Sequence, residues 1–144
     1  MSHWQTGKLD LKCSLNILKK ALINIMPEWE KHLLIDEMGG LEASYHHGPV
    51  KEKYQIVVPG SKGGIPNLYS DIGVVQESDG SWSLGGDYSV TSLKTKLTSE
   101  VMRMKAIAIA KLRGYEIVRN EDDGDEIVTD IRVDSDKARE LLHA

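Results

Sequence analysis

The clearest pattern along the chain is a helical one, between Ser92 and Arg113. Apolar residues recur there every three or four positions, which places them on one face of an α-helix. They are Leu93, Leu97, Val101, Met104, Ala108 and Leu112. Ser92 is a suitable N-cap, and Gly114 is a suitable C-terminal stop. The apolar run at 106–110 predicts that the second half of this helix is deeply buried.

The first part of the chain predicts a strand followed by a shorter helix. Apolar and polar residues alternate in part over 3–13, which indicates a strand. Ser14 can then cap a helix, and Pro27 ends it or bounds the next turn. The inner face of this helix carries Leu15, Leu18, Leu22 and Ile25. The stretch 28–38 fits either a short helix or a strand, and Gly39 and Gly40 mark a break.

Between 41 and 90 the pattern is that of β-strands. The candidate strands are 41–45, 53–58, 68–77 and 81–90. The last two flank Ser78-Asp79-Gly80. An Asp-Gly pair between two extended runs predicts a tight hairpin, because these residues tolerate positive φ values.

The C-terminal part predicts a second hairpin. The extended runs 115–120 and 126–134 flank an acidic turn at 121–125, and the tail 135–144 fits a short helix or a frayed end. Most strands therefore have a hairpin neighbour in sequence. We predict one α+β domain over 1–144, with an antiparallel sheet of about six strands and two main helices packed on one face.

Composition narrows the classes of function. The formal net charge of -4 gives little attraction for nucleic acid, so nucleic acid is not an expected partner. The sequence has no apolar run of membrane-spanning length and no signal peptide, and we therefore expect a cytoplasmic protein without membrane contact, in the host cytoplasm if it is viral. The single Cys13 excludes an internal disulfide and suits a reducing compartment.

Several short motifs occur together in one order. They are Met1-Ser2-His3-Trp4, LNILKKAL at 15–22, YSDIG at 69–73, SDGSWSLGGD at 78–87, and the set Ala106, Ala110, Gly114 and Tyr115. This order resembles a small family of unknown function encoded in plastid and cyanobacterial genomes, other bacteria and some phages. The resemblance covers 1–26 and 68–133. The stretch 45–66 departs from the family pattern, in which we expect a shorter connection. The resemblance implies an accessory role beside an AAA-type ATPase and carries over no catalytic residues.

The glycine- and proline-rich loop at 59–67 is the main candidate for a ligand site. Exposed amides beside Lys62 favour an anion such as a nucleotide phosphate. A P-loop would need a longer glycine spacing and an immediate helix, so a plain flexible loop is the alternative. The residues that would form this site are Lys51, Lys53, Tyr54, Gly60, Ser61, Lys62, Gly63, Gly64 and Tyr69.

Two carboxylates form a second candidate site. Asp71 and Asp87 lie on the two arms of the predicted 68–90 hairpin. If its register brings them together, they can act as an acid–base pair, and the alternative is two simple strand-end or solvent-facing aspartates. Adjacent histidines at 46 and 47 point to opposite faces of a strand and cannot easily share a metal. We predict no metal site and no cofactor.

Three functions are consistent with these patterns. The first is a non-enzymatic binding or adaptor protein that acts through protein–protein contacts, with an AAA-type ATPase as a candidate partner and a homo-oligomer as another assembly. The second is a protein that binds a nucleotide or other anion at 59–67. The third, least favoured, is a small hydrolase that uses Asp71 and Asp87.

Overall fold

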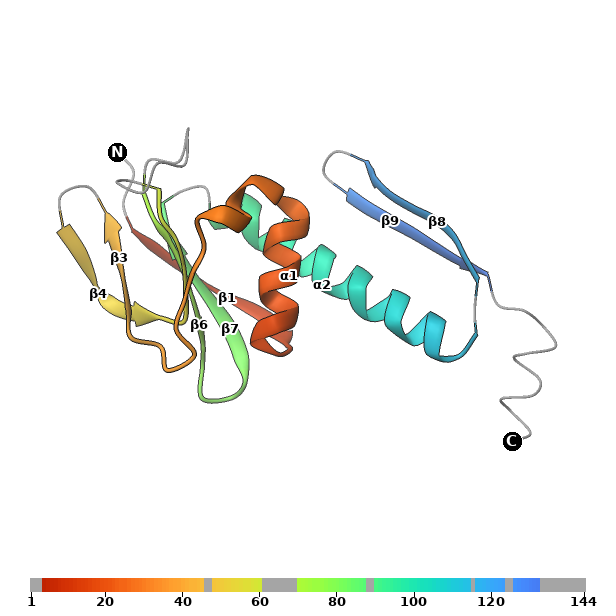
Figure 1. The fold of residues 1–144 in the computed structure, drawn as a ribbon, viewed down its shortest axis with the longest axis horizontal. Helices are drawn as coiled ribbons and strands as arrows, with labels where there is room; N and C mark the ends of the chain where they lie inside the picture. Colours follow the sequence, from red (N-terminus) through yellow and green to blue (C-terminus); the bar gives the residue numbers. More distant parts are fainter. Residues whose placement is uncertain are drawn as a thin grey trace. The chain divides into compact units, whose positions relative to one another are not determined.

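The computed structural model of the protein describes residues 4–45, 48–60, 70–87, 90–114, 116–123 and 126–132. The chain forms two compact units, 1–98 and 99–144, and the single domain expected from the sequence stays a prediction. The elements (Figure 1) are β1 (Gln5–Lys12), α1 (Leu15–Ile25), the 3-10 helix η1 (Pro27–Lys31), β2 (Leu34–Ile35), β3 (Leu41–Tyr45), β4 (Gly48–Tyr54), β5 (Ile56–Val58), β6 (Ile72–Gln76), β7 (Ser81–Gly86), α2 (Val90–Leu112), β8 (Glu116–Asp123) and β9 (Glu126–Arg132).

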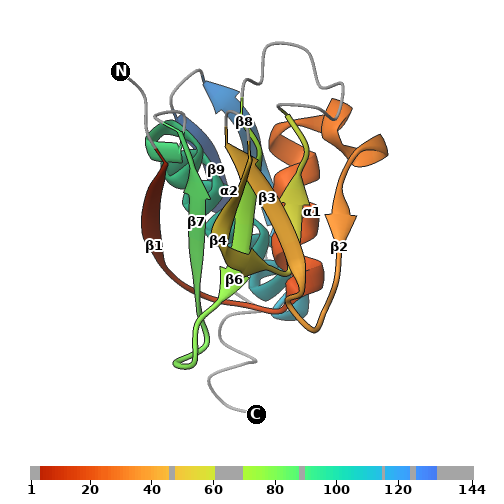
Figure 2. The ribbon, with the colours of Figure 1, turned by 90° about the vertical axis from the view of Figure 1, so that its left-hand side faces the viewer.

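The first unit is built on a five-stranded sheet of order β1-β7-β6-β5-β2, in which every neighbouring pair is antiparallel. The predicted α+β class is thereby confirmed. The helix α1 covers one face of this sheet, and the two-stranded β3–β4 ribbon lies on the other (Figure 2). The first turns of α2 share the side of α1, since Leu93 of α2 and Trp29 of η1 line one cavity with Ile72 of β6. We call these two sides the helix face and the ribbon face.

The helix face is packed with branched side chains. Because successive residues of a strand point to opposite faces, Ile72, Val74 and Leu84 share this side, and all three are buried. The facing residues of the helices are also buried: Leu18, Ala21 and Leu22 of α1, and Leu93 and Leu97 of α2. The helix α1 begins as predicted, with the Ser14 hydroxyl accepting from the Ile17 amide at 3.2 Å.

The ribbon face carries a smaller core of its own. Its buried members are Ala43, Tyr54 and Val57, and partly buried Trp4, Leu41, Val50 and Val75 pack against them. The indole of Trp4 lies 6.0 Å from the ring centroid of Tyr45 and 6.2 Å from that of Tyr54. An aromatic cluster therefore fixes the ribbon against the sheet.

The predicted continuous strand 53–58 is wrong, because the chain crosses from the ribbon to the sheet at Gln55. Residues up to Tyr54 belong to β4, and β5 begins at Ile56. Gln55 stabilises the crossing, with its amide donating to the Val74 carbonyl at 2.9 Å and its side-chain oxygen accepting from the Gln76 amide at 2.7 Å. The ambiguous stretch 28–38 contains both η1 and the short strand β2.

The hairpin predicted around Asp79-Gly80 is confirmed. Gly80 has φ +88°, and β6 pairs with β7 from Gly73↔Gly85 to Gln76↔Trp82. The Asp79 carboxylate accepts from the Ser81 amide at 2.9 Å and from the Lys8 ammonium at 2.9 Å. These bonds tie the turn to the edge strand β1.

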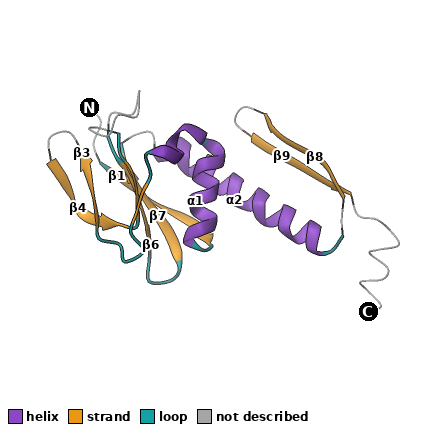
Figure 3. Ribbon diagram, viewed as in Figure 1, coloured by secondary structure: helices purple, strands orange, loops and turns teal. Residues whose placement is uncertain are grey.

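The helix α2 (Figure 3) differs from its prediction in where it begins and in the burial of its second half. It begins at Val90, whose amide donates to the Asp87 carbonyl, so Ser92 lies inside the first turn and is not the N-cap. The predicted burial of 106–110 is wrong, because Ala110 is buried but Ile109 is 49% exposed. Apolar residues on more than one face of a helix cannot all be covered from one side. The predicted stop is confirmed, since Gly114 has φ +71°.

The second unit contains the predicted C-terminal hairpin, with a shorter tip than expected. The β8–β9 ladder runs from Glu116↔Arg132 to Asp123↔Glu126. The acidic residues Glu121, Asp122 and Asp123 therefore belong to strand β8 and not to the turn. The prediction for the tail at 135–144 lies outside the described residues.

Candidate functional site

Tyr54, a predicted ligand-binding aromatic, is a core residue of the ribbon face. Its side chain is 2% exposed, and its ring lies over the backbone of Gly73 on β6 and Gly85 on β7. These two glycines are register partners. A Cβ atom at position 73 would lie 2.5 Å from the ring, so the absence of a side chain there lets the ring rest on the strand. In this arrangement Tyr54 holds the ribbon to the sheet.

The hydroxyl of Tyr54 and the indole nitrogen of Trp4 are buried in this cluster, and neither has a hydrogen-bond partner among the residues that the structure describes. Burial raises the pKa of the Tyr54 hydroxyl, against a smaller lowering by the nearby Trp4 N–H. The two groups lie close together without the geometry of a hydrogen bond. Both polar atoms are desolvated, which opposes folding.

Asp71 joins three segments of the first unit. One carboxylate oxygen accepts from the Ser44 amide at 2.8 Å, and the other accepts from the Gly60 amide at 2.8 Å. The Asp71 amide in turn donates to the Ser44 carbonyl at 3.1 Å. The side chain is 7% exposed, so this carboxylate is a buried clamp between β3, the segment after β5 and the start of β6.

The predicted carboxylate pair lies at the ends of the two hairpin strands. The paired residues of the ladder end at Gly73 and Gly85, Asp71 directly precedes β6, and Asp87 directly follows β7. Both are therefore strand-end aspartates, as one alternative predicted. Both are buried, at 7% and 5% exposure, so they do not face solvent. Both oxygens of Asp71 are engaged by amides, which favours a structural role for it, and the acid–base pair stays a prediction.

The anion site predicted at 59–67 is described only in part. Ser61, Lys62, Gly63, Gly64 and Tyr69 lie outside the described residues. The Gly60 amide donates to Asp71, so it is not free to bind an anion. Two lysines of the predicted set project from β4: Lys51 is exposed, and Lys53 pairs with Glu42 at 2.6 Å and lowers the pKa of that carboxyl. The anion site stays a prediction.

Within the ranges that the structure describes, no group of three or more His, Cys, Asp and Glu side chains is placed to hold a metal ion. His46 and His47 lie outside those ranges. Of the helices so described, none combines the length and the apolar character needed to cross a bilayer.

The sequence patterns missed an exposed apolar surface at one edge of the sheet. The edge strand β2 leaves both Leu34 and Ile35 exposed, and Met38 just beyond it is 91% exposed. Met38 lies on a tight turn, residues 36–40, which we call the Met38 turn. The Asp36 carboxylate accepts from the Met38 and Gly40 amides at 3.0 and 3.2 Å. The only hint in the sequence was Gly39-Gly40, and Gly39 has φ +78°.

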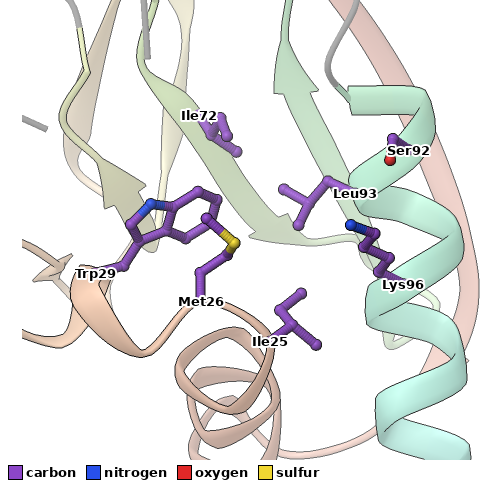
Figure 4. A pocket seen from close by; sticks show the side chains of 7 residues that line it. All are labelled: Ile25, Met26, Trp29, Ile72, Ser92, Leu93 and Lys96. Carbon is purple, nitrogen blue, oxygen red and sulfur yellow. The ribbon is translucent and has the colours of Figure 1, made fainter. Parts of the chain in front are cut away.

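A cavity of about 160 Å³ opens on the helix face between α1, η1, β6 and α2. Five apolar side chains line it (Figure 4): Ile25, Met26, Trp29, Ile72 and Leu93. Two polar residues of α2, Ser92 and Lys96, complete the lining. No pattern in the sequence indicated this cavity, because it forms between segments that are distant along the chain.

Comparison of the chain with protein-family models, curated proteins and solved structures finds no match. Function is therefore inferred from the geometry of the described residues.

Proposed function

We propose that the protein acts as a binding or adaptor protein through contacts with another protein, and that the Met38 turn and strand β2 form the contact surface. The observation that carries this proposal is the presentation of Met38. Its side chain is 91% exposed on a turn that the structure holds in place. Methionine is well suited to such a surface, because its flexible, polarisable side chain adapts to varied partners.

Hydrogen bonds hold the Met38 turn both from within and from the neighbouring Gln55. On one side, Asp36 accepts from two amides of the turn, and the Gly39 amide donates to the Asp36 carbonyl at 2.9 Å. On the other, the Gln55 side chain donates to the Glu37 carbonyl at 3.0 Å, and the Gln55 carbonyl accepts from the Asp36 amide at 2.8 Å. A partner would therefore meet a preformed apolar projection, which lowers the entropy cost of binding.

Strand β2 extends this surface. It pairs with β5 on one side only, through Leu34↔Val57 and Ile35↔Ile56, and is the last strand of the sheet. A partner strand can add to such an edge, with apolar side chains giving specificity. The family resemblance of the sequence supplies one candidate partner, an AAA-type ATPase, and a second copy of this chain is another.

The test places a photo-crosslinking residue at position 38 and, as a matched control, at Lys20, an exposed residue of α1. We expect a crosslinked partner from position 38 alone. Met38→Glu should weaken the purified complex by about tenfold or more, because an apolar anchor is replaced by a charge. Equal adducts from both positions, or unchanged affinity of the glutamate variant, would refute the proposal. The adduct mass separates a foreign partner from a second copy.

A further inference from the structure

The cavity on the helix face has the composition of a small amphiphile site. Its volume of about 160 Å³ is close to that of a cavity of about 150 Å³ known to hold one benzene molecule. Trp29, Ile72 and Leu93, which form part of its wall, are themselves buried. An apolar body of about six carbon atoms fits this space.

The polar part of the lining is confined to one helix. Ser92 and Lys96 are four residues apart on α2, so they project on the same side of it. Figure 4 shows the Lys96 ammonium directed from α2 toward the space beside Leu93. Within the described part of the chain, neither side chain has an ion pair or a hydrogen bond.

Among the described residues that line the cavity, none carries a negative charge that could neutralise Lys96. The acidic neighbours of Trp29 in sequence, Glu28 and Glu30, are not among the lining residues. One ammonium and one hydroxyl can satisfy the two oxygens of a carboxylate. The charge of the ligand is thus defined together with its size.

We propose that this cavity binds a carboxylate with an apolar body of about six carbons, with the body among Trp29, Ile72 and Leu93 and the carboxylate on Lys96 and Ser92. The same chemistry occurs in a free short-chain acid and in the apolar C-terminal residue of a peptide. This site is separate from the Met38 turn, so its test does not depend on the proposed adaptor function.

The experiment titrates ¹⁵N-labelled full chain with hexanoate, with hexanamide as an uncharged probe of the same shape. Probe concentrations reach about 10 mM, because a ligand this small has limited affinity. We expect saturable shifts of the Trp29 indole N–H and of the amides from Ser92 to Lys96, with hexanoate binding more tightly than hexanamide. A second arm uses a short acetylated peptide ending in leucine, either as the free acid or as the amide.

Substitutions of two lysines test which residue binds the carboxylate. Lys96→Met should weaken hexanoate binding about threefold to tenfold, the range for a partly screened charge-assisted hydrogen bond. Lys94→Met is the matched control, since Lys94 is exposed on the same helix and does not line the cavity. It should leave the affinity unchanged. Ser92→Phe, at another exposed position, should fill the opening and abolish binding.

Each result decides the proposal. Binding of hexanoate alone identifies a small metabolite-like ligand. Binding of the peptide acid identifies the C-terminus of another protein. Either result supports the proposal. It is overturned if neither acid shifts these resonances, if the amides bind as well as the acids, or if Lys96→Met and Lys94→Met behave alike. The ¹⁵N spectrum of each variant without ligand verifies that the variant is folded.

Discussion

On the helix face of the five-stranded sheet, Val74 and Leu84 present branched side chains to the helices. On the ribbon face, the next residues along the same two strands are Gly73 and Gly85, which present no side chain at all. On the helix face, side chains fill the space between the sheet and the helices, and a cavity of about 160 Å³ remains. On the ribbon face, glycines leave room on the strands, so that the ring of Tyr54 lies directly on the backbone. Neighbouring residues of one strand should therefore be sensitive to opposite changes in side-chain size, to an added side chain at Gly73 and to a shortened one at Val74.

The largest effect is expected at Gly73. Gly73→Ala should lower the free energy of unfolding by about 2–3 kcal/mol, because the added methyl group overpacks the site. It would lie within 2.6 Å of three ring atoms of Tyr54. On the other face, Val74→Ala should lower the free energy of unfolding by about 2 kcal/mol, because the shorter side chain leaves a cavity. Urea denaturation measures both.

A matched control for this comparison is Gly48→Ala on β4, where an added Cβ meets no atom within 4 Å. Gly48→Ala should lower the free energy of unfolding by much less than Gly73→Ala does. Adding Tyr54→Leu to Gly73→Ala should restore part of the lost stability, because the smaller side chain relieves the overlap. Purely additive losses in the double variant would contradict a direct overlap between the Tyr54 ring and position 73.

A smaller effect of opposite sign is expected from Tyr54→Phe. The buried hydroxyl of Tyr54 has no hydrogen-bond partner in the described part of the chain, so its removal should leave stability unchanged or raise it by up to about 1 kcal/mol. Thermal unfolding of the variant measures this. A loss of more than about 1 kcal/mol would show that the hydroxyl makes a favourable bond.

The smallest effect concerns the β6–β7 turn and pH. Ser81 and Lys8 lower the pKa of the exposed Asp79 carboxyl, with the Ser81 hydroxyl as the larger influence. Because the folded-state pKa lies below the unfolded one, the stabilisation is complete above about pH 4 and is lost on further acidification. A carboxyl ¹³C titration should show a rise of the Asp79 pKa in Ser81→Ala and in Lys8→Met. An unchanged Asp79 pKa in either variant would contradict the role of that residue.

Local patterns in the sequence predicted the elements that depend on neighbouring residues. The Ser14 cap, the Asp79-Gly80 turn and the Gly114 stop are confirmed because each is determined within a few positions. The crossing at Gln55 was not predicted, because it depends on bonds to β6 and to the Met38 turn. The positions of Asp71 and Asp87 at strand ends could be predicted from the local pattern, whereas their burial could not, because it depends on segments distant along the chain.

The Asp71 clamp also bears on how the protein emerges from the ribosome. Its carboxylate accepts hydrogen bonds from the amides of Ser44 and Gly60, which are 27 and 11 positions earlier in the chain. Gly73 and Gly85, which lie against Tyr54, also follow the ribbon in sequence. While the chain is synthesised from its N-terminus, the ribbon is complete before its support exists. A nascent chain that has left the ribosome only as far as the residues before β6 would expose Leu41, Tyr54 and Val57 together. We therefore expect its tendency to aggregate to fall once the β6–β7 hairpin has emerged and folded.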